Sequence, residues 1–239
     1  MFDKISTTYD FLNHALSFGI DIHWRRVAAA LVMDHYESNK NNKCSKFSML
    51  DIATGTGDLL FAILKNKSAI EFNVTAIDLE TSMIELAKKK FANRRMSDFF
   101  VDFRVADAVA VADPEYKSES FDIITSAFGV RNFYDLDRGL ANIHRMLKMG
   151  GQVVILEFSA EGINPIFKPF FIPYLNFFVP FVGGLISKDF KAYDYLNKSA
   201  RSFPCGEKFV SILEKANFLD VKMIPLTFGL VTIYIGKKR

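Results

Sequence analysis

A glycine-containing turn lies at residues 50–59, which read Leu50-Asp51-Ile52-Ala53-Thr54-Gly55-Thr56-Gly57-Asp58-Leu59. The run that leads into it, residues 47–52, has the apolar character of a buried strand, and a helix with one apolar face is expected to begin near Asp58. Two glycines separated by one residue let the backbone approach a ligand closely, and the first turn of the helix offers unpaired N–H groups there. The segment therefore predicts a cradle for a nucleotide-like cofactor.

The residues around the glycines indicate which cofactor binds. A dinucleotide fingerprint that starts at Gly55 needs a third glycine at position 60, where the chain has Leu60. Asp51 and Asp58 place acids on both sides of the turn, and carboxylates repel a pyrophosphate. S-adenosyl-L-methionine (SAM) has no phosphate and carries an ammonium and a sulfonium cation. The sequence thus favours SAM over NAD.

Acidic residues also end the next two predicted strands. Asp78 ends one apolar run, and Asp107 and Ala108 follow residues 101–105. Because the carboxyl ends of parallel strands meet at one edge of a sheet, we expect Asp51, Asp78 and Asp107 to share one site. An acid after the second strand suits a ribose diol, and an acid after the third suits the exocyclic amine of adenine. The alternative for each acid is an exposed loop carboxylate without a ligand.

Seven segments have the apolar pattern of strands. They are residues 47–52, 73–78, 101–105, 121–128, 152–158, 221–224 and 230–235. Helical segments separate the first strand from the second, the second from the third and the fourth from the fifth, which indicates parallel pairing, and the last two strands read as an antiparallel hairpin. We expect one α/β domain over residues 1–239. Its fold would be Rossmann-like, a mostly parallel seven-stranded sheet with a C-terminal antiparallel hairpin and helices on both faces.

The loop after the fourth strand carries two polar side chains, Arg131 and Asn132. Because this loop leaves a central strand, we expect both side chains to point into the same cleft as the acids. The helix that follows the loop is expected to run until the paired glycines at 150–151 stop it.

Two further segments are helical in pattern and rich in aromatic residues. Residues 1–36 read as an N-terminal helical lid in which Tyr9 is a candidate ligand contact. Residues 160–203 read as a helical insertion for substrate, and the prolines in it argue against a membrane span over residues 163–186. Two interpretations remain open: aromatic faces buried on the domain, or an apolar wall for a long hydrocarbon that also touches a membrane surface.

Composition excludes several classes of protein. The 239 residues carry a formal net charge of +3, which gives no indication of nucleic-acid binding. Neither the two cysteines nor the four histidines have metal-ligand spacing, so no metal site is expected. The N-terminal residues lack the pattern of a signal peptide, which favours a cytoplasmic protein.

Taken together, these motifs resemble the class I SAM-dependent methyltransferases, and within them the ubiquinone/menaquinone biosynthesis C-methyltransferase family. The resemblance covers essentially the whole chain. Residues 51–58 resemble the cofactor loop of that family, and Phe128-Gly129-Val130-Arg131-Asn132 resembles its most specific signature. Residues 156–159 and 193–196 follow the family pattern as well. One departure is Ala53, which stands where many members of the superfamily have their first glycine.

The resemblance implies transfer of the SAM methyl group to a ring carbon of a polyprenylated quinol, as in the conversion of demethylmenaquinol to menaquinol in menaquinone biosynthesis, with ubiquinone biosynthesis left open. It implies catalytic roles for Arg131, which would stabilise the quinol oxyanion, and for Asn132 and Tyr9, which would position the ring. The residues expected to bind SAM are Asp51, Gly55, Thr56, Gly57, Asp78, Asp107, Ala108 and Ala127.

The expected partners are the polyprenyl quinol and no nucleic acid, and the sequence leaves open a homodimer and peripheral contact with the inner face of a membrane. An alternative function is methylation of another lipid, such as a sterol or a phospholipid headgroup. Another alternative is a noncatalytic scaffold that keeps the fold, which the three strand-end acids count against.

Overall fold

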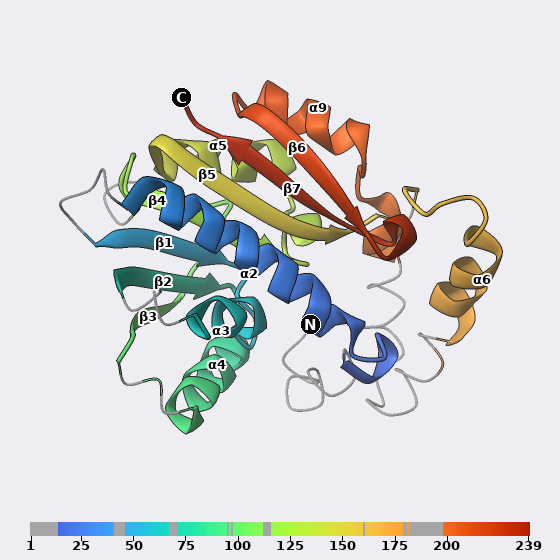
Figure 1. Ribbon diagram of the computed structural model, residues 1–239, viewed down its shortest axis with the longest axis horizontal. Helices are drawn as coiled ribbons and strands as arrows, with labels where there is room; N and C mark the ends of the chain where they lie inside the picture. Colours follow the sequence, from blue (N-terminus) through green and yellow to red (C-terminus); the bar gives the residue numbers. More distant parts are fainter. Residues whose placement is uncertain are drawn as a thin grey trace.

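The computed structural model describes residues 14–40, 46–66, 71–94, 96, 98–111, 116–159, 161–178, 181 and 198–239. In this part of the chain, seven strands form one sheet in the order β3-β2-β1-β4-β5-β7-β6 (Figure 1). The strands are β1 (Phe47–Ile52), β2 (Phe72–Asp78), β3 (Phe100–Val105), β4 (Phe121–Ala127), β5 (Leu147–Phe158), β6 (Leu219–Leu226) and β7 (Val231–Lys237).

Helices cover both faces of the sheet. The α-helices are α2 (Ile20–Asn39), α3 (Asp58–Leu64), α4 (Thr81–Asn93), α5 (Leu136–Met146), α6 (Lys168–Pro173) and α9 (Glu207–Lys215). Three short turns of other helix types are η4 (Val130–Asn132), η5 (Tyr174–Phe178) and η6 (Thr227–Gly229). In Figure 1, α2 crosses the near face of the sheet beside α3, whereas α5 and α9 lie behind it.

The pairing of the strands confirms the predicted fold class. The pairs β3–β2, β2–β1, β1–β4 and β4–β5 are parallel, and β7 pairs antiparallel with both β5 and β6. The chain builds β2 and β3 on one side of β1 and then returns to place β4 on the other side. Sheets of this kind bind ligands outside the carboxyl ends of the strands at such a reversal.

The core lies in two apolar layers, one on each face of the sheet. Neighbouring strand residues alternate between them: Val154 packs in the layer with α2 and α3, and Val153 packs in the layer with α5 and α9. A parallel strand that is buried on both faces reads as a continuous apolar run, which explains the sequence of β5. Both layers hold the central strands rigidly, so the loops at their carboxyl ends have a fixed base.

The predicted end of α5 is wrong. The helix ends at Met146 and not at the paired glycines, because Leu147 already begins β5. The register of β5 against β4 shifts, so that Phe121 pairs with Leu147 but Ile123 pairs with Gln152. Gly150, with φ of +79°, lies in this irregular part of the strand. The glycines therefore mark a bulge that lets the strand begin directly after the helix.

Both aromatic segments lie partly outside the described residues. Within the N-terminal segment expected to be helical, α2 is described and extends beyond residue 36 to Asn39, but Tyr9 is not in the described part. Within the insertion, α6 and η5 are described, and residues 193–196 are not. No helix in the described ranges is long and apolar enough to cross a membrane.

Candidate active site

A cavity of about 380 Å³ opens at the strand reversal between β1 and β4. This volume is within the range of about 300–1,000 Å³ that is usual for small-molecule sites. Its wall comes from the ends of β1 to β4, from the loops that follow them, and from α2, α3 and α4. The lining residues expected from the sequence are Asp51, Gly55, Thr56, Asp78, Asp107, Ala108, Ala127 and Asn132. The topology of the sheet thus brings together residues that lie far apart in the sequence, from Asp51 to Asn132.

The glycine turn has the backbone that its sequence predicts. Gly55 and Gly57 have φ of +56° and +87°, a left-handed conformation that glycine adopts without strain. A Cβ on Gly57 would lie 2.7 Å from the Phe61 ring, so this position needs glycine for space as well. Gly57 is not among the residues that line the cavity, and its role is to start α3. Ala53 is also left-handed, with φ of +51°, which explains why a glycine is usual there.

Asp51 lies at the floor of the cavity and is only 1% exposed. Its carboxylate accepts hydrogen bonds from Thr54 Oγ1 at 2.6 Å and from Thr125 Oγ1 at 2.5 Å. Burial raises the pKa of Asp51 to about 6, although the two threonine hydroxyls oppose this effect. A carboxylate held under these conditions is stabilised by any cation that enters the cavity.

Asp78 connects the end of β2 to the glycine turn. One carboxylate oxygen accepts a hydrogen bond from the Gly55 N–H at 2.8 Å, and the other accepts from the Glu80 N–H at 3.0 Å. Burial raises the pKa of Asp78 above its usual value, while these backbone N–H groups lower it. The two bonds fix the direction of the carboxylate, and each oxygen keeps a lone pair for a ligand hydroxyl.

Asp107 is fixed in the same manner at the end of β3. Its Oδ1 accepts a hydrogen bond from the Val109 N–H at 2.8 Å, and Ala108 beside it is buried. The small side chain of Ala108 leaves a flat wall next to the acid. Three strand-end acids therefore line one cavity, in the order of the strands β3, β2 and β1.

The structure places Arg131 differently from the expectation. Its guanidinium forms an ion pair with Glu157 at 2.9 Å, donates to the carbonyl oxygen of Phe128, and lies 5.8 Å and 5.5 Å from the centres of the Phe128 and Phe158 rings. The side chains of Arg131 and Glu157 are 2% and 0% exposed. Arg131 is not among the residues that line the cavity, whereas its neighbour Asn132 is. The loop leaves the central strand as predicted, but only one of its two polar side chains faces the cavity.

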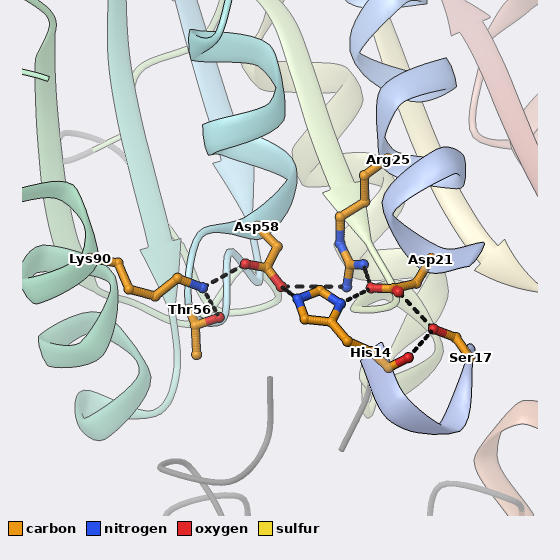
Figure 2. A network of polar contacts seen from close by, with 7 residues as sticks. All are labelled: His14, Ser17, Asp21, Arg25, Thr56, Asp58 and Lys90. Atoms are coloured by element: carbon orange, nitrogen blue, oxygen red, sulfur yellow. Dashed lines mark hydrogen bonds and ion pairs between the residues drawn. The ribbon is translucent and has the colours of Figure 1, made fainter. Parts of the chain in front are cut away.

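A polar network connects α2 to the glycine turn, and the sequence interpretation missed it (Figure 2). Lys90 of α4 donates to Thr56 at 2.9 Å and pairs with Asp58 at 2.5 Å. Arg25 of α2 pairs with Asp21 and lies 3.9 Å from Asp58. Burial raises the pKa of Asp58, but the charges of Lys90 and Arg25 outweigh it and hold this pKa below its usual value.

The spacing of Asp21 and Arg25 is the one signal in the sequence that could have indicated this network. Residues four apart on a helix face one another, so an acid and a base at this spacing form a pair. The position of Lys90 has no such local signal, because its two partners lie on a different segment of the chain.

The charges in the cavity fit SAM. Five carboxylates line it, those of Asp51, Asp58, Asp78, Glu80 and Asp107. Arg25 is the only Arg, Lys or His among the described lining residues. SAM brings two cations, a ribose diol and one carboxylate, whereas a dinucleotide brings a pyrophosphate that these acids would repel.

Comparisons with known proteins agree with this site. Residues 1–238 match the family model described as the ubiE/COQ5 methyltransferase family. A demethylmenaquinone methyltransferase from Chlorobaculum parvum is 39% identical over 238 residues, which cover 100% of this chain and 91% of that protein. A ubiquinone/menaquinone biosynthesis C-methyltransferase, UbiE, from Geotalea uraniireducens is also 39% identical over 238 residues, with coverage of 100% and 94%.

Similarity of this chain to a solved structure at low sequence identity shows the fold alone. The DszA carbon methyltransferase is 15% identical, with a TM-score of 0.66 over 90% of this chain and 54% of that chain. The sequence relationship is much closer, because it extends over the full length at well above 30% identity. The chain belongs to the ubiE/COQ5 methyltransferase family.

Proposed function

We propose that this protein is a SAM-dependent C-methyltransferase that methylates a ring carbon of a polyprenylated quinol, converting a demethylmenaquinol into a menaquinol. The observation that carries the proposal is the acid-lined cavity at the strand reversal, in a chain of the ubiE/COQ5 methyltransferase family. Relatives at 37–39% identity that bear the name demethylmenaquinone methyltransferase support the substrate. The cofactor, SAM, supplies a methyl group that its sulfonium activates.

The strand-end residues hold the cofactor according to their chemistry. Asp78 binds the ribose diol, Asp107 and Ala108 hold the adenine, and Asp51 balances the ammonium group. The backbone of Gly55 and Thr56 approaches the cofactor closely, and Ala127 forms part of the wall. All of these residues line the cavity, whereas Gly57, which was also expected to bind SAM, does not.

The acceptor ring lies on the side of the cavity formed by Asn132, Phe133 and Tyr134, which also line it. A quinol carbon becomes a good nucleophile once the ring hydroxyl loses its proton, so the site must hold the ring and favour the oxyanion. The Asn132 amide is exposed in the cavity and donates to that oxygen. The expected contact from Tyr9 is part of this proposal as a second group that positions the ring.

Arg131 acts as a positioning residue in this scheme. Its backbone N–H donates to Glu157 Oε1 at 3.1 Å, and its guanidinium pairs with Glu157 Oε2. These two contacts fix η4 to β5 and thereby fix Asn132. The opposite charges of Arg131 and Glu157 largely cancel at the position of the quinol ring. Direct stabilisation of the quinol oxyanion by Arg131 is therefore not favoured.

An aromatic surface lies at α6 and η5, which stand apart from the sheet in Figure 1. We define it by its exposed side chains, which are Ile166, Phe170, Phe177, Phe178 and Phe181. It is connected to the segment that precedes α2 and to the hairpin: Tyr174 Oη donates to the Leu16 carbonyl, and the Phe167 and Phe228 rings stack at 3.9 Å. We propose that this surface rests on the inner face of a membrane and delivers the polyprenyl tail, with Lys168 attracted to anionic lipid.

Transfer of labelled methyl groups tests the reaction. The protein is incubated anaerobically with methyl-labelled SAM and a chemically reduced short-tail demethylmenaquinol, or with a reduced ubiquinol precursor. Label in the menaquinol product supports the proposal. Label only in the product of the ubiquinol precursor would assign the protein to ubiquinone biosynthesis instead. Label in neither, with SAM still bound, would favour another lipid. Asp78→Ala should remove both SAM binding and transfer.

Cosedimentation with vesicles tests the membrane contact. Vesicles of phosphatidylglycerol and phosphatidylcholine should retain the protein, and the double variant Phe170→Ser, Phe177→Ser should release it. Phe100→Ser is the matched control, because Phe100 is 63% exposed at the start of β3, away from the aromatic surface. Equal retention of all three proteins would contradict the contact.

A further inference from the structure

The cavity holds one cationic group whose role the proposed function does not use. Arg25 is the only Arg, Lys or His among the described lining residues, which include five carboxylates. Its side chain is 10% exposed. A buried cation in an acidic cavity either balances its acidic neighbours or binds an anionic group of the ligand. The only anionic group of SAM is its carboxylate, so the two roles can be separated by experiment.

The position of Arg25 along the cavity agrees with the second role. The groups suited to adenine and ribose, Asp107 and Asp78, lie at the ends of β3 and β2. Arg25 lies beside Asp58 in the first turn of α3 and 5.5 Å above the centre of the Phe128 ring, which follows β4. A ligand whose adenosyl part occupies the β3 and β2 ends must place its amino-acid part at the β1 and β4 ends. That end of the cavity is where Arg25 lies.

The guanidinium is fixed on one side only. NH1 forms an ion pair with Asp21, and Asp21 is held in turn by Ser17 Oγ at 2.6 Å and by His14 Nδ1 at 2.7 Å. NH2 lies 3.9 Å from Asp58 Oδ2, which is too far for a hydrogen bond. Figure 2 shows the guanidinium between the two carboxylates. This side of the guanidinium therefore keeps donor capacity for another acceptor.

Asp58 has a cation that lies closer to it than Arg25 does. Lys90 Nζ pairs with Asp58 at 2.5 Å from the opposite side. Asp21 is balanced by Arg25 through NH1 alone. A carboxylate that arrives at NH2 would form a charge-assisted hydrogen bond, which is about twice as strong as a neutral one.

We propose that Arg25 binds the carboxylate of the methionine part of SAM and that Asp21, held by His14 and Ser17, positions Arg25 for this contact. The proposal rests on the proposed function, because it assumes an adenosyl ligand in the cavity. It makes the N-terminal helix α2 a part of the cofactor site and not only a cover over the sheet.

Calorimetric titration tests the proposal without any turnover. The ligands are S-adenosylhomocysteine and the same compound without its carboxylate. The wild-type protein should bind the first more tightly, and Arg25→Gln should weaken it by about 10- to 100-fold while changing the affinity for the second by less than about 2-fold. Arg25→Lys should restore part of the affinity for the first ligand only.

Two further variants make the outcome specific. Arg26→Gln is the matched control, because Arg26 is the next residue of α2, is exposed and does not line the cavity. If Arg25→Gln folds poorly because Asp21 loses its partner, the variant Asp21→Asn, Arg25→Gln keeps the charge balance and gives the same comparison. Equal weakening of both ligands, or no weakening, would overturn the proposal. A wild-type protein that binds neither ligand would overturn the proposed function as well.

Discussion

Asp51 at the end of β1 and Thr125 of β4 are direct partners across the parallel pair, and Thr125 Oγ1 donates to the Asp51 carboxylate at 2.5 Å. The register of the sheet therefore builds the floor of the cavity. The hydroxyl lowers the pKa of Asp51, but burial raises it more, to about 6. An acid with such a pKa loses its charge in a mildly acidic solution.

The first prediction concerns the pH dependence that Asp51 causes. Its pKa in the folded protein is above the ordinary value of 3.8, so the folded protein binds more protons between about pH 4 and pH 6. The contribution of Asp51 to the free energy of unfolding therefore falls as the pH rises through this window, by about 3 kcal/mol in total. Asp51→Asn should be more stable than wild type at pH 8, and this advantage should shrink at pH 5.

The same variant should bind S-adenosylhomocysteine more weakly at pH 8, because its ammonium loses a carboxylate partner. Urea unfolding and calorimetric titration at both pH values measure the two effects. Asp58→Asn is the control with the opposite sign, since the pKa of Asp58 is lowered and loss of its charge should destabilise the protein at pH 8. An Asp51→Asn variant that is less stable than wild type at pH 8 would contradict the prediction.

The second prediction concerns the close approach of Gly129 to Ala53. A Cβ on Gly129 would collide with the Ala53 methyl group and lie 2.8 Å from Ser126 Oγ. Gly129 has φ of −106°, so its backbone itself accepts alanine. Gly129→Ala should lower the free energy of unfolding by about 1–3 kcal/mol through overpacking. Ala53→Gly should recover part of that loss, because it removes both the obstructing methyl group and a left-handed alanine.

A double-mutant cycle in urea measures this coupling. Gly139→Ala is the matched control, because its new methyl group would meet Phe133 and not Ala53. Addition of Ala53→Gly should leave the cost of Gly139→Ala unchanged. If the effects of Ala53→Gly and Gly129→Ala on the free energy of unfolding were additive, the glycine turn and the loop after β4 would not be in contact.

The sheet and the cofactor acids could be predicted because their signals are local. A glycine turn after an apolar run, repeated acids at strand ends, and helices between strands together fix a parallel sheet with a site at one edge. Asp51, Asp78 and Asp107 then have to meet, whatever their distance in the sequence. No contact had to be known in advance.

The features that the sequence did not predict are of two kinds. Some depend on contacts between segments that only the folded chain brings together, and one is a choice between two local structures with the same sequence signal. The loop direction suggests that Arg131 enters the cleft, but Glu157 of β5 supplies a buried partner that only the sheet brings close. The paired glycines at 150–151 fit a helix end and a bulge equally well, because both use a positive φ. Lys90 has partners on a different segment of the chain, and its contact with Thr56 depends on how α4 packs.

The third prediction concerns Trp24, the only tryptophan of the chain. Its Nε1 donates to Thr227 Oγ1 at 2.7 Å, which joins α2 to η6 beside the hairpin. Thr227→Val should lower the free energy of unfolding by about 1–3 kcal/mol, because the buried indole N–H loses its acceptor. Thr227→Ser keeps the hydroxyl and should stay close to wild type. Unfolding monitored by tryptophan fluorescence measures the stability of both variants. Equal stability of Thr227→Val and Thr227→Ser would exclude the hydrogen bond.

The fourth prediction separates the two roles considered for Arg131. If it acts through Glu157, the two residues form one unit, and loss of either partner leaves a buried charge without compensation. Arg131→Met and Glu157→Gln should each lower the free energy of unfolding by about 3–5 kcal/mol, and the double variant should lose much less than the sum. Glu161→Gln, in an exposed pair with Lys208, should have no measurable effect.

Catalysis gives the decisive comparison for this pair. Under conditions where each variant is folded, Glu157→Gln should slow methyl transfer about as much as Arg131→Met, since both remove the ion pair that helps to hold η4 and Asn132 against β5. Addition of the second change should then slow the reaction little further, because residues that act as a unit have non-additive effects. If Arg131 instead touched the quinol oxygen, Arg131→Met would be far slower than Glu157→Gln at the same folded fraction. That result would return Arg131 to the group of residues in contact with the reacting ring.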